Sequence, residues 1–188
     1  MKLAILGATG QVGSQLTTEA LSRGHTVTGI SRHPDALPNH PQLKSVKADL
    51  TDYAELPAIL AAHDAVIAAV KFATLDGAKL LAAVKRSGAK RFLVVGGAGS
   101  LETTPGQRLV DQPEFPAAYK PEALAAGSFW RYCAVKPSWI GRFYPRPHIS
   151  MPAQKLENSV WAAMLCWSTR RAKAIFRSPT TRSHFSTR

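Results

Sequence analysis

The first dozen residues constrain the fold of this chain more than any other stretch. An apolar run, Leu3–Leu6, enters a turn in which glycine recurs at every third position, as Gly7, Gly10 and Gly13. A short, continuous apolar run is typical of a buried parallel strand. Gly7 permits a tight turn, Gly10 has no side chain to block a pyrophosphate, and Gly13 lets the next helix lie close to the strand.

The helix after this turn is expected over 11–23, closed by Gly24. Its first N–H groups, around Thr9, Gln11 and Val12, have no partner within the helix and are suited to bind phosphate oxygens. The glycine spacing alone is a weak signal. Its place between a strand and a helix is what predicts a dinucleotide-binding loop. The alternative is an ordinary strand-to-helix turn with no ligand.

Strands and helices alternate along the chain from residue 25 to residue 95. This alternation implies right-handed crossovers and a doubly wound parallel sheet of the Rossmann type, in the α/β class. Ligands of such sheets bind at the carboxyl ends of the strands. The predicted strands are 25–30, 43–48, 65–70 and 91–95, and the predicted helices between them are 51–62 and 74–87.

Length and hydrophobicity place the chain among single-domain proteins. Its 188 residues, 45% of them hydrophobic, are enough for a core. The apolar run after Lys2 is too short for a signal peptide, and no stretch approaches the roughly 20 apolar residues of a membrane span. We therefore expect a cytoplasmic protein with no membrane partner.

The residues after the second predicted strand bear on the choice of nicotinamide cofactor. An acid at this place, about 20 residues past the glycine turn, holds the ribose 2′-hydroxyl of NAD in many such folds. Here the place holds Ser31 and Arg32. A guanidinium pairs with phosphate through charge-assisted hydrogen bonds, so these residues favour NADP(H), with NAD(H) as the second choice. The alternative is that Arg32 is a solvated surface side chain.

Several segments together resemble one family. The glycine motif is similar to that of the extended and atypical short-chain dehydrogenases. The run from Met1 to about Phe129 resembles the NmrA-like group of NAD(P)H-binding proteins, which includes the NADH-flavin reductase type. The resemblance implies that Asp49 and Leu50 lie beside the adenine. The end of the strand over 65–70, at Ala69 and Val70, is expected to border the nicotinamide ribose. The resembling segments are Ala4–Gly10, Ala48–Asp52, His63–Ile67, Val94–Ser100 and Tyr119–Leu124.

Few residues are placed for acid–base chemistry. Classical short-chain dehydrogenases use Tyr-x-x-x-Lys, in which the lysine lowers the pKa of the tyrosine. Tyr119 is followed four positions later by Ala123, so this relay is absent as written. Ser100 follows the glycines after the fifth strand, near the place where family members carry a substrate-binding hydroxyl. We take Ser100 and Tyr119 as candidate catalytic residues, the alternative for each being a solvent-facing or packed side chain.

The missing relay bears on the predicted function. Hydride transfer to a flavin or another easily reduced acceptor needs little acid catalysis, because the cofactor carries the chemistry. The resemblance then implies a flavin-reductase-like, NAD(P)H-dependent oxidoreductase whose acceptor is a small molecule of the flavin or quinone class. The alternative is a non-catalytic NADP(H) sensor that regulates a partner. The loop expected over 101–118 either shapes the substrate pocket or is a plain surface excursion.

The composition changes sharply at residue 130. Residues 1–129 carry a net charge of +2, whereas residues 130–188 hold 11 Lys+Arg and one acid, Glu157, a net charge of +10. All four tryptophans and both cysteines lie in this last third. Cys133 and Cys166 are too few and too far apart for a metal site. We therefore divide the chain into a Rossmann domain, 1–129, and a basic tail, 130–188.

A one-base deletion at codon 129 or 130 would account for this tail. With suitable codons and one thymine restored after Phe129, the other frame reads SFLALLRGETELDWTFLSP and later TGKFRLGG, strings that resemble the family's last strand and the segment after it. We hypothesise that the tail is out of frame. The closing strand and helix would then be lost or disordered, and the outer edge of the fifth strand poorly covered. The alternative is a basic arm that binds nucleic acid, but the frame hypothesis explains the basicity without that function.

Overall fold

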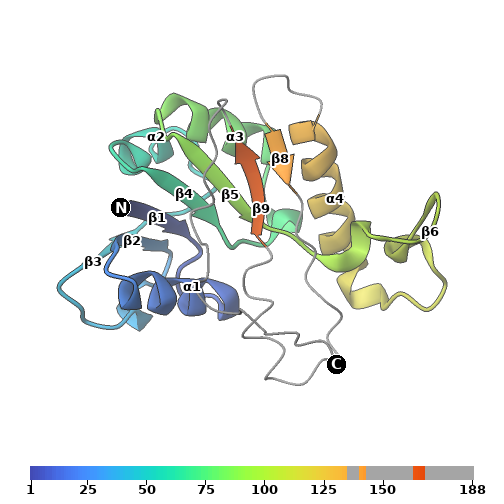
Figure 1. The fold of residues 1–188 in the computed structure, drawn as a ribbon, viewed down its shortest axis with the longest axis horizontal. Coiled ribbons are helices and arrows are strands. Elements are labelled where there is room, and N and C mark those ends of the chain that lie inside the picture. The colour runs from blue at the N-terminus through green and yellow to red at the C-terminus, as the bar shows by residue number, and fades with distance from the viewer. Residues whose placement is uncertain (135–139, 143–162, 168–188) are drawn as a thin grey trace, which may run out of the picture.

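The computed structural model describes residues 1–134, 140–142 and 163–167, and Figure 1 shows how its elements are arranged. A seven-stranded sheet has the order β3-β2-β1-β4-β5-β9-β8. Strands β1 to β5 are parallel, which confirms the predicted Rossmann-type α/β sheet. The strands are β1 (Lys2–Leu6), β2 (Thr26–Ser31), β3 (Leu43–Lys47), β4 (Ala65–Ala68), β5 (Arg91–Val95), β8 (Ile140–Arg142) and β9 (Ala163–Trp167).

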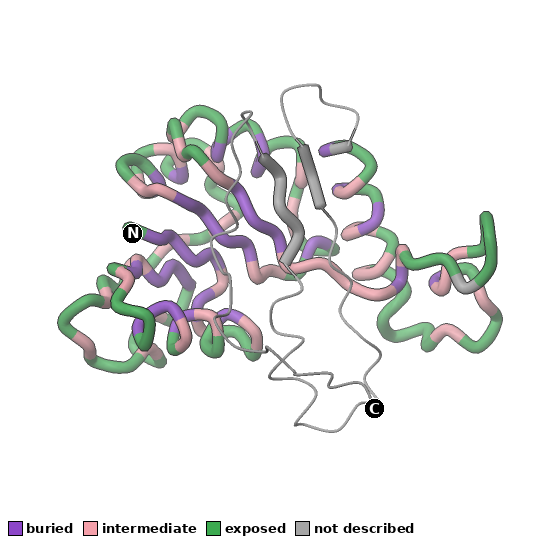
Figure 2. Tube along the Cα trace, viewed as in Figure 1, coloured by how far each residue is buried: buried purple, intermediate pink, exposed green. Residues whose placement is uncertain are grey.

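Helices cover both faces of the parallel strands. Alternate residues of β1 point to opposite faces, so Leu3 and Ile5 pack with Ala20 and Leu21 of α1 (Gln11–Ser22) on one face. On the other face Leu6 belongs to a larger core formed with α2 (Leu56–Leu60), α3 (Gly77–Arg86) and α4 (Lys120–Ala134). Figure 2 shows that the central strands are buried along most of their length.

Helix α3 begins three residues later than the predicted range 74–87. The carboxylate of Asp76 caps its first turn, because Oδ1 accepts the N–H groups of Ala78 and Lys79 at 3.0 and 3.1 Å. The predicted apolar face is confirmed, with Leu80, Leu81 and Val84 almost fully buried. The helix ends before Gly88, whose φ of +73° suits glycine.

Helix α2 is much shorter than the range 51–62 predicted for it. The carboxylate of Asp52, the expected cap, accepts hydrogen bonds from the N–H groups of Ala54 and Glu55 at 3.1 and 3.4 Å. These bonds close a turn in front of the helix, since a short polar side chain competes for the backbone N–H groups that a helix would use. The helix itself begins only at Leu56, with Pro57 in its first turn.

Helix α4 continues past the predicted domain boundary at residue 129. Trp130 packs against the larger core, and Cys133 is fully buried in it. The outer edge of β5 pairs antiparallel with β9, so the expectation that this edge is poorly covered is wrong for the described strands. The rest of the tail lies outside the described residues, namely residues 135–139, 143–162 and 168–188. Most of the frame hypothesis concerns these residues.

Within the described part of the chain, no helix is both long enough and apolar enough to cross a bilayer.

Candidate functional site

The glycine turn lies where the sheet changes its direction of winding, between β1 and β4. Gly7 has a φ of +79°, and its N–H donates to the carbonyl of Ile30 at the end of β2 (2.9 Å). A Cβ on Gly7 would lie 2.4 Å from the carbonyl oxygen of Ala69, and a Cβ on Gly13 would lie 2.0 Å from that of Gly7. Both positions therefore need glycine for the close approach of β1, β4 and α1.

Gly10 is the exposed member of the three. Its φ and ψ, −71° and 165°, are open to any residue, and a Cβ there would lie 3.2 Å from the Gly7 carbonyl oxygen. Helix α1 begins at the next residue without a side-chain cap or an acid in its first turn. The N–H groups of Gln11, Val12 and Gly13 are therefore available to an anion, which the positive end of the helix dipole also favours.

Two of the predicted cofactor residues lie together at the end of β2. Ser31 is 6% exposed, and its hydroxyl is one of two buried side-chain polar atoms without a hydrogen-bond partner among the described residues. Arg32, the next residue, is exposed. A buried hydroxyl without a partner costs free energy, so Ser31 is suited to a ligand that offers an acceptor.

Asp49 lies beside this pair, just after β3. Its Oδ1 accepts the N–H and the hydroxyl of Thr51 at 2.9 and 2.7 Å. The hydrogen bond from the Thr51 N–H, followed by that from the Thr51 hydroxyl, holds the pKa of Asp49 below its ordinary value, and the positive charge of Arg32 adds to this. Leu50 is half-buried and packs against the larger core. The structure thus brings the predicted adenosine-side residues to one corner of the sheet.

Ala69 and Val70 form the wall of the turn on the β4 side. The N–H of Ala69 donates to the carbonyl of Leu6 (2.9 Å). Val70 reaches the turn as well, because its Cγ1 would lie 3.4 Å from a Cβ on Gly7. Both predicted residues therefore adjoin the glycine turn.

The sequence interpretation did not single out Glu122 of α4, which fixes the loop after Val70. Its two carboxylate oxygens accept the N–H groups of Phe72 and Ala73 at 2.7 and 2.8 Å. The ring of Phe72 stacks on Phe129 of the same helix, with 4.8 Å between ring centroids. Glu122 lies inside the resembling segment Tyr119–Leu124, and that was the only signal that could have pointed to it.

The two candidate catalytic residues lie near different turns of α4 and differ in exposure. Ser100 ends a short 3-10 helix, η3 (Ala98–Ser100), and its buried hydroxyl also has no partner among the described residues. Its Cβ would lie 3.8 Å from a Cβ on Gly127 of α4. Tyr119 precedes α4 by one residue and is 53% exposed. Eight residues of helix separate Gly127 from Tyr119, a rise of about 12 Å.

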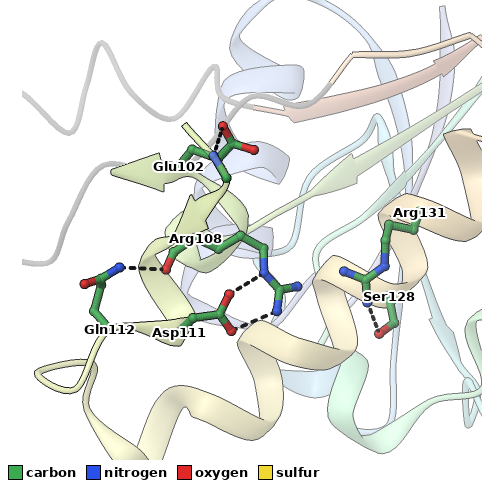
Figure 3. Close-up of polar contacts among 7 residues, drawn as sticks. Glu102, Arg108, Asp111, Gln112, Ser128 and Arg131 are labelled. Carbon is green, nitrogen blue, oxygen red and sulfur yellow. Dashed lines mark hydrogen bonds and ion pairs between the residues drawn. The ribbon is translucent and has the colours of Figure 1, made fainter. Parts of the chain in front are cut away.

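The excursion after Ser100 is ordered by its own polar contacts. It forms a hairpin of β6 (Glu102–Thr104) and β7 (Gln107–Arg108), which projects beyond α4 in Figure 1. Arg108 makes a two-point ion pair with Asp111 (2.7 and 2.8 Å), and Figure 3 shows this pair beside α4. The hydrogen bond from Arg108 lowers the pKa of Asp111.

The base of the excursion lies closer to the sheet than the hairpin does. Val110 is buried, and its Cβ would lie 3.5 Å from a Cβ on Gly99, next to Ser100. The base of the excursion therefore packs against η3, while the hairpin projects away from it (Figure 1).

The geometry fits an extended dinucleotide along the carboxyl edge of the sheet. The first turn of α1 lies between the residues predicted to hold the adenosine, at the ends of β2 and β3, and the apolar residues Ala69 and Val70 after β4. The unpartnered hydroxyl of Ser31 and the exposed, side-chain-free Gly10 are the two features that a bound cofactor would use.

The comparisons with known proteins agree with this geometry. The sequence pattern that defines the family described as "NAD(P)H-binding" matches residues 7–144. The chain is 35% identical over 133 residues to the uncharacterized protein YwnB of Bacillus subtilis, covering 68% of this chain and 62% of YwnB. The chain therefore spans less than two thirds of the length of that relative.

Two solved structures are similar in both sequence and fold. A candidate epimerase from Bacteroides thetaiotaomicron is 37% identical, with a TM-score of 0.65 over 72% of this chain and 66% of the other. A candidate NADH-flavin reductase from Streptococcus pneumoniae is 36% identical, with a TM-score of 0.59 over 73% of this chain and 67% of the other. The resemblance to NmrA-like proteins stated from the sequence is thereby confirmed.

Proposed function

This chain belongs to the NAD(P)H-binding family, and from that membership we propose that it is an NAD(P)H-dependent oxidoreductase of the flavin-reductase-like type. The proposed reductant is NADPH, with NADH as the weaker alternative. The proposed acceptor is a small molecule of the flavin or quinone class. The cytoplasmic location expected from the sequence forms part of the same proposal.

The single observation that carries this proposal is the phosphate-binding turn. Gly7 and Gly13 are locked by close backbone contacts, while Gly10 is exposed and the first N–H groups of α1 have no side-chain cap. A turn of this kind binds a pyrophosphate without any charged side chain. The candidate flavin reductase from Streptococcus pneumoniae supports the choice of reaction type.

The residues of the chain have distinct roles in this proposal. The first turn of α1 holds the pyrophosphate, and Ser31 with Arg32 holds the 2′-phosphate. Asp49 and Leu50 flank the adenine, and Ala69 with Val70 borders the nicotinamide ribose. The bound cofactor supplies the hydride.

Neither candidate side chain is well placed to donate a proton to the acceptor. The hydroxyl of Ser100 is buried, and the exposed Tyr119 lies two helical turns from the part of α4 that Ser100 faces. An acceptor such as an oxidised flavin or a quinone needs no alkoxide to be protonated in the transition state. The arrangement therefore favours such an acceptor over an alcohol–ketone pair.

The same arrangement favours a second candidate function, that of an NADP(H) sensor. If Ser100 and Tyr119 take no part in chemistry, the protein binds NADP(H) without oxidising or reducing it. A sensor would bind the dinucleotide with the same turn and report its state through a partner.

Oxidation of NADPH by the purified protein separates the two functions. The rate of loss of the reduced nicotinamide is measured with FMN, riboflavin or menadione as acceptor, and NADPH binding is measured by titration in the absence of acceptor. Binding with turnover supports the oxidoreductase, and binding without turnover of any acceptor supports the sensor. The Gly10→Ala variant, expected to lose cofactor binding, controls for background oxidation.

A further inference from the structure

Lys47, the last residue of β3, lies beside Ser31 in the sheet. The two residues are register partners in the parallel pair β2 and β3. The pairs Gly29 with Ser45 and Val27 with Leu43 lie two and four residues earlier along the same strands. Register partners in a parallel pair point to the same face, and successive residues alternate between faces. Ser31 and Lys47 therefore share the face of Val27 and Leu43.

Packing identifies this face as the one that carries the glycine turn. A Cβ on Gly29 would lie 3.2 Å from the Cβ of Ala8 and 3.5 Å from the Cδ1 of Leu43. Val46, the residue before Lys47, packs against the core on the opposite face. Lys47 thus emerges on the side of the sheet on which α1 begins.

The surroundings of Lys47 leave its charge available. Lys47 is exposed, and no ion pair involves it among the described residues. Its neighbour across the strands, Ser31, is buried with an unpartnered hydroxyl. Arg32 adds a second cation. The acid Asp49 lies near Arg32, whose positive charge helps to lower the pKa of the Asp49 carboxyl.

We propose that Lys47 is a specificity-determining residue that completes a three-point site for the 2′-phosphate of NADPH. The inference rests on the proposed function and adds a residue that the glycine and β2 motifs do not contain. The Ser31 hydroxyl donates one hydrogen bond to the phosphate, and the Arg32 guanidinium donates two parallel hydrogen bonds. The Lys47 ammonium contributes a positive charge. NADH lacks the phosphate, so it leaves all three groups without an anion.

Equilibrium binding of NADPH and NADH to three single variants of the full chain tests this proposal. Lys47→Gln should raise the Kd for NADPH about tenfold, a typical loss for one charge-assisted contact. It should leave the Kd for NADH within about twofold, because NADH makes no such contact. Lys47→Arg should retain most of the NADPH affinity. The matched control is Lys44→Gln, an exposed lysine of the same strand whose position faces the other side.

The outcomes separate this inference from the function on which it rests. An unchanged Kd for NADPH in Lys47→Gln, or an equal loss in Lys44→Gln, overturns the role of Lys47 while the dinucleotide site stands. A wild-type protein that binds NADPH and NADH equally overturns the 2′-phosphate site as a whole. A wild-type protein that binds neither dinucleotide overturns the proposed function itself. Competition by 2′-AMP, weakened only in Lys47→Gln, supports the assignment independently of turnover.

Discussion

At the scale of single residues, the glycines of the turn serve different purposes and should respond differently to the same change. A methyl group at Gly13 would overlap the Gly7 carbonyl, since the two atoms would lie 2.0 Å apart. Gly13→Ala should therefore lower the free energy of unfolding by about 1–3 kcal/mol or more, as overpacking does. Urea denaturation measures this loss. Gly97→Ala, where nothing lies within 4 Å, should unfold like the wild type.

Gly10→Ala should instead preserve the fold and lose the ligand. The added Cβ would lie 3.2 Å from the Gly7 carbonyl, which needs only a small shift, and the backbone angles already suit alanine. The methyl group would occupy the place that we assign to the pyrophosphate. Titration should show NADPH binding weakened by about tenfold or more. Wild-type affinity in this variant would place the phosphates elsewhere.

Arg32 provides a second test at this scale, directed at the choice between the two cofactors. Arg32→Ala should weaken NADPH binding by about 1.5–3 kcal/mol, the value of a lost charge-assisted hydrogen bond. NADH binding should be almost unchanged. Calorimetric titration with each cofactor gives both numbers. Equal losses for NADPH and NADH would contradict the assignment of Arg32 to the 2′-phosphate.

At the scale of elements, the cap of α3 makes the stability of the fold depend on pH. The hydrogen bond from the Lys79 N–H is the main cause that lowers the pKa of Asp76, and the Lys79 ammonium, 3.6 Å from Oδ2, adds to it. A carboxyl whose pKa is lower in the folded state stabilises the fold fully above its ordinary pKa. That stabilisation is lost as the pH falls through the folded pKa.

Thermal unfolding of two variants across the acid range checks this dependence. The gap in Tm between the wild type and Asp76→Ala should be largest near neutral pH and shrink as the pH falls. Asp76→Ser keeps an uncharged cap, so its gap to Asp76→Ala should not vary with pH. If the difference in Tm between the wild type and Asp76→Ala stays constant down to low pH, the charge of Asp76 does not contribute to stability.

The contact between α4 and the loop after β4 is the second prediction at this scale. Glu122→Gln replaces one acceptor oxygen by an NH2 group, which leaves one of the N–H groups of Phe72 and Ala73 without its partner. The free energy of unfolding should fall by about 1–3 kcal/mol, toward the lower value because the site is half-exposed. Urea denaturation measures it, with the exposed Glu114→Gln as the neutral control. Similar losses in both variants would exclude a specific role for Glu122.

At the scale of the whole molecule, the tail determines the charge. Residues 130–188 contribute +10 of the net +12. Under the frame hypothesis, resequencing the gene across codons 125–135 should reveal one further base, and the protein read through it should be longer and less basic. That protein should elute earlier from a cation-exchange column. An unchanged gene sequence would make the tail a genuine product, and binding to a labelled oligonucleotide would then test the nucleic-acid alternative.

Local patterns in the sequence determined most of the Rossmann frame. The predicted ranges of β1 to β5 match the structure to within two residues. Apolar runs carried this prediction at β1, β4 and β5, because a buried parallel strand is a short, continuous apolar run. The glycine spacing predicted the turn, since only glycine tolerates the contacts at Gly7 and Gly13. Ser31 and Arg32 were predicted from their place after the second strand, whereas Asp49 and Leu50 were expected from the family resemblance.

Only the tertiary structure decided the contacts between segments far apart in the chain. Glu122 meets Phe72 across 50 positions, Ser31 meets Lys47 through strand register, and β5 pairs with β9 from the tail. The placement of Ser100 against α4 is a contact of the same kind, because it depends on where η3 meets that helix. Periodicity and spacing report which face of an element is buried, but the neighbour that buries it is selected by packing of the whole chain.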